Sequence, residues 1–158
     1  MKFRIITVGR GAAKPIKAMV DDYTKRLQRM APTTIIEIAE ERRTQASSSN
    51  VEQLLIKEAA RIKDKIPQGT LVVPLAITAP VVSSTDFAKK IAQKRDSGEG
   101  EICFIIGGPD GLHKSLLNNT PWQLSFGPMT FPHMLVRVML LEQLYRAMTI
   151  LERVPYHR

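Results

Sequence analysis

Cysteine is almost absent from this chain, since Cys103 is the only one among its 158 residues. A framework of disulfides is therefore excluded, and a reducing compartment fits the composition. Cys103 lies inside the apolar run at residues 102–106. A free cysteine in such a run is usually a small core residue and only rarely a nucleophile. We expect Cys103 to be buried on a strand.

Long apolar runs are also missing. No segment approaches the roughly 20 apolar residues of a membrane-spanning helix. The opening Met-Lys-Phe-Arg-Ile-Ile-Thr-Val-Gly is too short and too strand-like for a signal peptide. We therefore expect a soluble, cytoplasmic protein with no membrane partner. A chain of this length is most simply one domain, residues 1–158.

The chain has few signatures of metal, nucleotide or hydrolytic chemistry. His113, His133 and His157 are far apart and near no cysteine pair or HExxH pattern, so we expect no metal site. The loop at residues 107–111 lacks the Lys-Ser/Thr of a P-loop and is not GxGxxG. No GxSxG elbow is present, although spacing alone leaves a Ser-His-Asp site open.

Positive charge is what the chain has in excess. Lys and Arg number 23 against 15 Asp and Glu, which gives a formal net charge of +8. That charge attracts a polyanion such as nucleic acid at low salt, but it is equally compatible with an ordinary basic protein. Basic residues in an N-terminal helical segment and near the C-terminus are candidates to hold phosphates. They are Lys14, Lys17, Lys25, Arg26, Arg29, Arg137 and Arg158.

Apolar periodicity predicts strands that alternate with helices. Strands are expected at residues 3–8, 33–38, 70–75, 102–106 and 122–125, and helices at 14–29, 50–66, 83–95, 114–118 and 135–151. A polar loop is expected at 40–49, and Ser83 with Asp86 resembles a capping box. This alternation favours an α/β fold with a mainly parallel sheet covered by helices on both faces.

The last predicted helix is apolar around most of its circumference. In so small a domain the sheet can cover only one side of such a helix, so a second subunit is the natural cover for the other. Arg137, Glu142 and Arg146 inside the helix argue against a membrane. We expect a homodimer whose interface includes this helix, and a charge at Leu141 or Leu144 should disrupt it.

Two glycine-bearing loops follow apolar runs in the last third of the chain, at residues 107–112 and 127–133. If both lie at the same end of one sheet, they form a crevice for a small molecule. The chain then stops on Tyr156-His157-Arg158. Those three side chains can stack on a base and hold a phosphate, or they can form an ordinary frayed end.

Three motifs in order carry a family resemblance: FIIGGPDGLH, LSFGPMTFPHMLVRVMLLEQLYRAMTI and the terminal PYHR. With the opening MKFRIITVGR, they resemble the small single-domain SPOUT methyltransferases that modify large-subunit (23S) ribosomal RNA. The resemblance implies methylation of N3 of a pseudouridine, with S-adenosylmethionine as methyl donor. It also implies a homodimer, and an α/β fold whose C-terminal part forms a deep trefoil knot.

The resemblance also assigns site residues. Glycine at 107 would admit the adenosyl group to the backbone, so Gly107→Val is expected to abolish donor binding while leaving the fold intact. His133, Tyr156, His157 and Arg158 are the catalytic candidates, as base, stacking group or anion stabiliser, with no choice among them. The donor pocket is expected at Leu75, Gly107, Phe126, Gly127, Pro128, Met129, Thr130 and Phe131.

One segment departs from the family pattern. After Leu75 the family usually has an acidic residue and then a Gly-Lys pair, whereas this chain reads Ala76-Ile77-Thr78-Ala79-Pro80. Contacts from residues 76–80 to donor or RNA are therefore in question. This departure supports a second hypothesis, a non-enzymatic RNA-binding or ribosome-associated protein that keeps the fold. Donor binding separates the two.

Overall fold

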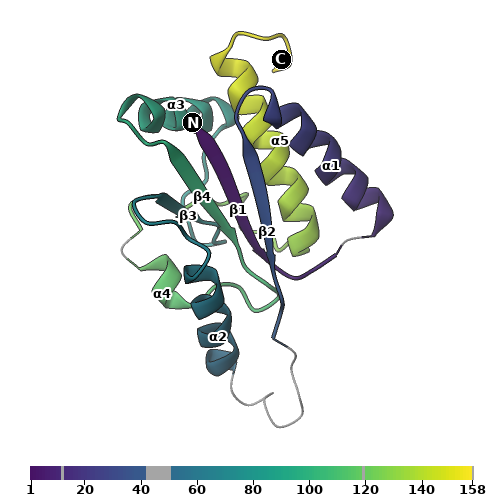
Figure 1. Cartoon of the computed structure of the whole chain (residues 1–158), viewed down its shortest axis with the longest axis vertical. Helices are drawn as coiled ribbons and strands as arrows, with labels where there is room; N and C mark the ends of the chain where they lie inside the picture. The colour runs from purple at the N-terminus through teal and green to yellow at the C-terminus, as the bar shows by residue number, and fades with distance from the viewer. Residues whose placement is uncertain (12, 42–50, 119, 158) are drawn as a thin grey trace.

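A computed structural model describes residues 1–11, 13–41, 51–118 and 120–157. Within them, strands and helices alternate as expected up to residue 117, after which a second helix follows without a strand between the two (Figure 1). Asn50, expected to cap the second helix, and most of the expected 40–49 loop lie outside the described residues. The elements are β1 (Lys2–Val8), α1 (Lys14–Gln28), β2 (Thr33–Ile38), α2 (Val51–Lys63), β3 (Leu71–Pro74), α3 (Ser84–Asp96), β4 (Glu101–Ile106), α4 (Lys114–Leu117) and α5 (His133–Leu151).

The four strands form one parallel sheet in the order β2-β1-β4-β3. Successive side chains point to opposite faces, which divides the core in two. Ile5 and Phe104 pack with α1, α3 and α5 on one face, while Ile6, Cys103 and Ile105 pack with α2 and α4 on the other. The expected parallel sheet with helices on both faces is confirmed (Figure 1).

Local signals explain two details. The Ser83 hydroxyl accepts a hydrogen bond from the Asp86 backbone N–H at 3.1 Å, so α3 begins where the capping pattern predicts. Cys103 is fully buried on β4, as expected, and burial raises the pKa of its thiol to about 12. The thiol therefore stays protonated at neutral pH and is part of the core.

The fifth expected strand, at residues 122–125, is not formed as such. Leu124 donates its N–H to the Pro74 carbonyl and accepts from Ala76 N–H, at 3.1 and 3.0 Å. Ser125 then pairs with Val81 in a second isolated bridge. The segment meets the chain on both sides of the turn after β3, so it has too few consecutive partners for a ladder. The expected trefoil knot stays a prediction.

Helix α5 lies between α1 and α3 and contacts both. These two helices cover sides of α5 that we expected a second subunit to cover. Leu141 and Leu144 are fully buried within the single chain, so a charge at either would disrupt the fold rather than report on a dimer. The more open part of the helix is the strip that carries Leu135 and Met139.

Leu144→Ala should lower the free energy of unfolding by about 2–5 kcal/mol, because it leaves a cavity among fully packed side chains. Ile56→Ala on α2 is the control, since Ile56 is 40% exposed and its truncation should cost much less. Denaturant titration followed by circular dichroism measures both. Equal losses would contradict the packing of α5.

Candidate functional site

The carboxyl ends of β3 and β4 enclose a cavity of about 850 Å³. Ligands bind at this edge in open parallel sheets, because the loops after neighbouring strands diverge there. Three stretches of chain supply most of the wall, and α4 and α5 contribute Leu117 and Val136. The three stretches are residues 75–77, residues 106–112, and residues 124–133 without Pro128.

The two glycine loops therefore meet at one crevice, as the sequence predicts. Of the residues expected in the donor pocket, only the exposed Pro128 is outside the cavity lining. His133 also lies in the lining. Sequence reasoning missed Ile106, Leu112 and Val136, which are apolar neighbours of the quoted motifs. The expected residues that line the cavity are Leu75, Gly107, Phe126, Gly127, Met129, Thr130 and Phe131.

Gly107 is required by its own loop. The Gly111 N–H donates to the Gly108 carbonyl at 3.0 Å and closes a tight turn. A Cβ at Gly107 would lie 2.4 Å from the Gly111 carbonyl oxygen, which is backbone and cannot rotate away. Gly107→Val would therefore rebuild the loop, and the expectation that this variant leaves the fold untouched is wrong.

The atypical 76–80 segment still forms part of the wall. The Ala79 N–H donates to the Ala76 carbonyl at 3.1 Å and makes a turn. The Ser125 hydroxyl lies 3.2 Å from the Ile77 carbonyl oxygen and accepts from Gly127 N–H at 3.1 Å. Ser125 thus joins this turn to the second glycine loop. Ala76 and Ile77 face the cavity with apolar side chains where the family usually has charge.

Arg137 does not hold a phosphate from this position. Only 3% of its side chain is exposed, and its guanidinium pairs with Glu37 at 2.5 Å. It also donates to the Thr7 hydroxyl and the Gly9 carbonyl, both at 3.3 Å. The expectation of a phosphate contact is wrong because the Arg137 side chain is buried and already paired with a carboxylate. One turn earlier, His133 has its Nε2 buried with no hydrogen-bond partner among the described residues.

The C-terminal tail is docked rather than frayed. The Tyr156 hydroxyl donates to Glu142 at 3.1 Å and lies 3.4 Å from the Tyr23 hydroxyl. Its ring packs edge-on against Tyr145, and the Arg146 guanidinium lies 4.7 Å from the ring centroid. Burial, and then the bond to Tyr23, raise the pKa of Tyr156 above its usual value. This ring is therefore engaged with α1 and α5.

His157 follows on the surface, with Nδ1 at 3.3 Å from Arg146 Nη1. A guanidinium only donates, so Nδ1 must accept, and the neutral ring then carries its proton on Nε2. The outward nitrogen is thus a hydrogen-bond donor. Arg158 lies outside the described residues.

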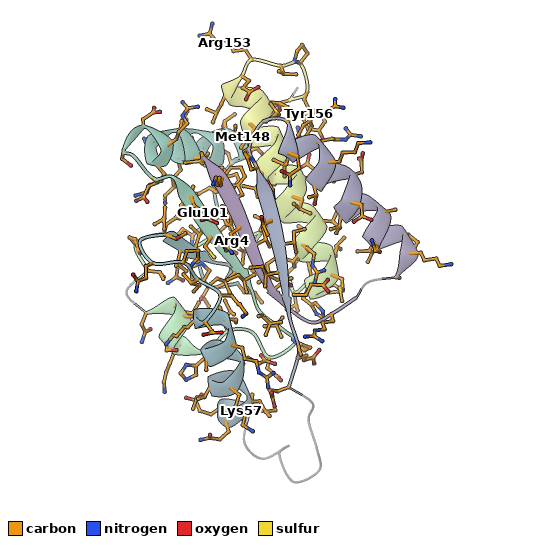
Figure 2. The ribbon with its side chains drawn as sticks, viewed as in Figure 1. Arg4, Lys57, Glu101, Met148, Arg153 and Tyr156 are labelled. Atoms are coloured by element: carbon orange, nitrogen blue, oxygen red, sulfur yellow. The ribbon has the colours of Figure 1, made fainter. Side chains whose placement is uncertain are left out.

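The catalytic candidates fall into two separate groups. His133 begins α5 beside the cavity, whereas Tyr156 follows the end of that helix. The tail turns back along α5, and the Tyr156 hydroxyl reaches Glu142, nine residues or about 14 Å along the helix axis from His133. Tyr156 lies toward the end of α5 that is away from the carboxyl edge of the sheet (Figure 2). Within one chain, neither Tyr156 nor His157 lines the cavity.

A family profile described as "Predicted SPOUT methyltransferase" matches residues 1–157. The chain belongs to the SPOUT methyltransferase family. It is thus an enzyme of methyl transfer and uses a methyl donor. The resemblance noted in its motifs is confirmed over the whole length.

Relatives and solved structures agree with this membership. Proteins named ribosomal RNA large subunit methyltransferase H are 44% identical in Magnetococcus marinus and 41% in Acetivibrio thermocellus, with at least 99% of each chain covered. A methylase family protein of Haemophilus influenzae gives a TM-score of 0.54 at 12% identity, over 96% of this chain and 66% of that one. One from Neisseria gonorrhoeae gives 0.52 at 11%, over 99% and 95%. These two structures support the fold alone.

Two further findings concern the described part of the SPOUT chain. None of its helices is long and apolar enough to cross a membrane. No three His, Cys, Asp or Glu side chains in it are grouped so that they could hold a metal ion.

Gly107→Ala should lower the free energy of unfolding by roughly 1–3 kcal/mol, because the added carbon overpacks against backbone. Gly100→Ala is the matched control, since a Cβ there has nothing within 4 Å. Thermal denaturation of both variants measures the difference. A Gly107→Ala protein as stable as Gly100→Ala would show that the 107–111 turn is not closed as described.

Proposed function

We propose that this chain transfers a methyl group from S-adenosylmethionine to N3 of a pseudouridine in large-subunit ribosomal RNA. It would do so in the cytoplasm, as a single domain of 158 residues. The supporting observation is the cavity in which both glycine loops converge, in a chain whose relatives are named for ribosomal RNA methylation.

The residues of the cavity fit an S-adenosyl group. Its volume of about 850 Å³ is within the usual range for small-molecule sites. Leu75, Ile106 and Phe131 offer apolar surface to a purine. The turn at 107–111 exposes backbone N–H and C=O groups that can bind polar edges. When bound, the donor supplies an activated methyl on a sulfonium, and the chain must hold and orient it.

The protein's chemical task is mainly alignment, because the displacement is in-line at an activated carbon. The N3 proton must also leave, so the developing anion on the base needs a donor or the proton needs an acceptor. His157, with its proton on the outward Nε2, suits stabilisation of that anion. Tyr156, held by Glu142 and Tyr23, suits the placement of His157 and the residue that follows it.

We also propose a homodimer. A groove of about 460 Å³ runs along α5 between α1 and α3, lined by Met19, Leu135 and Met139 among others. Val81 and Val82 beside it are 65% and 39% exposed. Exposed apolar surface of this kind marks an interface. A two-fold dimer on this face also allows the tail of one protomer to approach the cavity of its partner.

The RNA would contact basic residues left outside ion pairs. Lys17 and Arg26 are engaged by Asp21 and Asp22 along α1. Lys14, Lys25 and Arg29 on the same helix or at its end are exposed. These are the side chains that we assign to phosphates.

Removal of residues 157–158 should reduce methyl transfer by at least about tenfold, the value of one charge-assisted contact. The affinity for S-adenosylmethionine should not change, because His157 is not among the residues that line the cavity. Transfer of labelled methyl to large ribosomal subunits and calorimetry with S-adenosylmethionine measure the two effects. Wild-type protein that binds no donor would favour the non-enzymatic alternative, and equal transfer rates would remove the tail from the site.

Mixed dimers test whether the tail acts on the partner's cavity. One protomer carries Ala76→Phe, which fills the cavity wall, and the other lacks residues 157–158. If tail and cavity come from different protomers, a mixture of the two inactive proteins should recover about a quarter of wild-type activity, since half the dimers are mixed and hold one complete site. No recovery, with dimers shown by sedimentation, would place both in one protomer.

A further inference from the structure

The turn that follows β1 packs directly on the start of α5. Gly9 closes β1 with φ +95° and donates its N–H to the Ile38 carbonyl at 2.9 Å. A Cβ at Gly9 would lie 2.5 Å from His133 Nε2 and 3.1 Å from His133 Cδ2. The imidazole therefore occupies the space that any side chain at position 9 would need.

An ion pair between the buried Arg137 and the exposed Glu37 supports this arrangement. Arg137, one turn after His133, donates to the Gly9 carbonyl at 3.3 Å and pairs with Glu37. The second Glu37 oxygen accepts from Gly11 N–H at 3.4 Å. Both ends of the Gly9–Gly11 turn are thus tied, through one carboxylate and one guanidinium, to the first turns of α5. Arg137 itself is only 3% exposed, so its guanidinium is held inside the protein at this point.

The same turns of α5 form a wall of the cavity. His133, Pro132 and Val136 lie in its lining, next to Thr130 and Phe131 of the second glycine loop. A displacement of the His133 ring therefore shifts surface that faces the cavity. Gly108, in the first glycine loop, also packs close to β1, since a Cβ there would lie 3.0 Å from Val8 Cγ1.

We propose that Gly9 is a positioning residue for the donor site. Because Gly9 has no side chain, the His133 ring can occupy the space beside it, and the Arg137–Glu37 pair keeps the ring aligned with the cavity wall. This inference rests on the proposed function, in which the cavity holds S-adenosylmethionine. It assigns His133 a structural part in the wall, since its buried Nε2 faces Gly9. The opening motif MKFRIITVGR ends inside the β1–α1 turn, and this inference makes Gly9 of that motif a support of the site.

Gly9→Ala and Gly11→Ala form a matched pair that tests the proposal. Both glycines have positive φ, +95° and +73°, so both alanines carry backbone strain. A Cβ at Gly11, however, has nothing within 4 Å, whereas the one at Gly9 meets His133. Gly9→Ala should raise the calorimetric Kd for S-adenosylmethionine about tenfold, and Gly11→Ala should leave it near wild type. Equal Kd values for the two variants would overturn the proposal.

A double-mutant cycle separates this contact from a general loss of stability. In a His133→Ala background, Gly9→Ala should raise the Kd for S-adenosylmethionine no more than Gly11→Ala does. The Gly9→Ala and Gly11→Ala variants should then also have the same Tm. A Gly9 effect that persists without the imidazole would overturn the proposal. If Gly9→Ala does not fold, the Kd for S-adenosylmethionine is measured in His133→Ala and Arg137→Lys, which change the cavity wall and leave Gly9 in place. An unaltered Kd in both variants would overturn the proposal.

The outcome also distinguishes this inference from the function on which it rests. Wild-type protein that binds no S-adenosylmethionine would overturn both. If wild-type protein binds S-adenosylmethionine and the Gly9→Ala and Gly11→Ala variants have equal Kd values, only the role of Gly9 would be overturned.

Discussion

The burial of α5 between α1 and α3 determines where His133 and Tyr156 lie relative to each other. The helix is a rigid rod, and its first turns carry His133 and Arg137 against the cavity and the β1–α1 turn. Its second half carries Glu142 and Arg146, which contact Tyr156. Because neighbouring elements fix this helix on three sides, the packing of the core determines how far the cavity lies from the C-terminal tail. The proposed homodimer, in which the tail of one protomer approaches the cavity of its partner, is consistent with this separation.

Charge burial in this chain serves geometry more than stability. Burial of the Arg137 guanidinium has a desolvation cost that offsets much of its attraction to the exposed Glu37. Arg137 and Glu37 nonetheless satisfy the Thr7 hydroxyl and the backbone at Gly9 and Gly11. An apolar replacement would leave those groups without that partner. The pair thus specifies one arrangement of two loops and a helix start, which is what a binding wall needs.

Sequence reasoning was most successful where local rules suffice. Alternating apolar runs predicted the parallel sheet, and Ser83 predicted the start of α3. Of the residues that the motifs assigned to the donor pocket, all but Pro128 line the cavity. The strand at 122–125 was wrong because its partners are set by a remote turn, and Arg137 was misjudged because its partner lies 100 residues away. Nor does any local pattern show that Tyr156 packs on Tyr145 and Glu142.

The segment around Leu124 has a consequence for how the chain folds. Leu124 hydrogen-bonds the backbone at the end of β3, and Ser125 pairs with Val81 on the far side of the same turn. These contacts join parts of the chain about fifty residues apart, so loop-closure entropy must be overcome before they form. During synthesis, β1 to β4 emerge before this segment and can pair without it. The cavity therefore cannot close until the chain has been made at least as far as this segment, so its wall depends on late, long-range contacts rather than on the early strands alone.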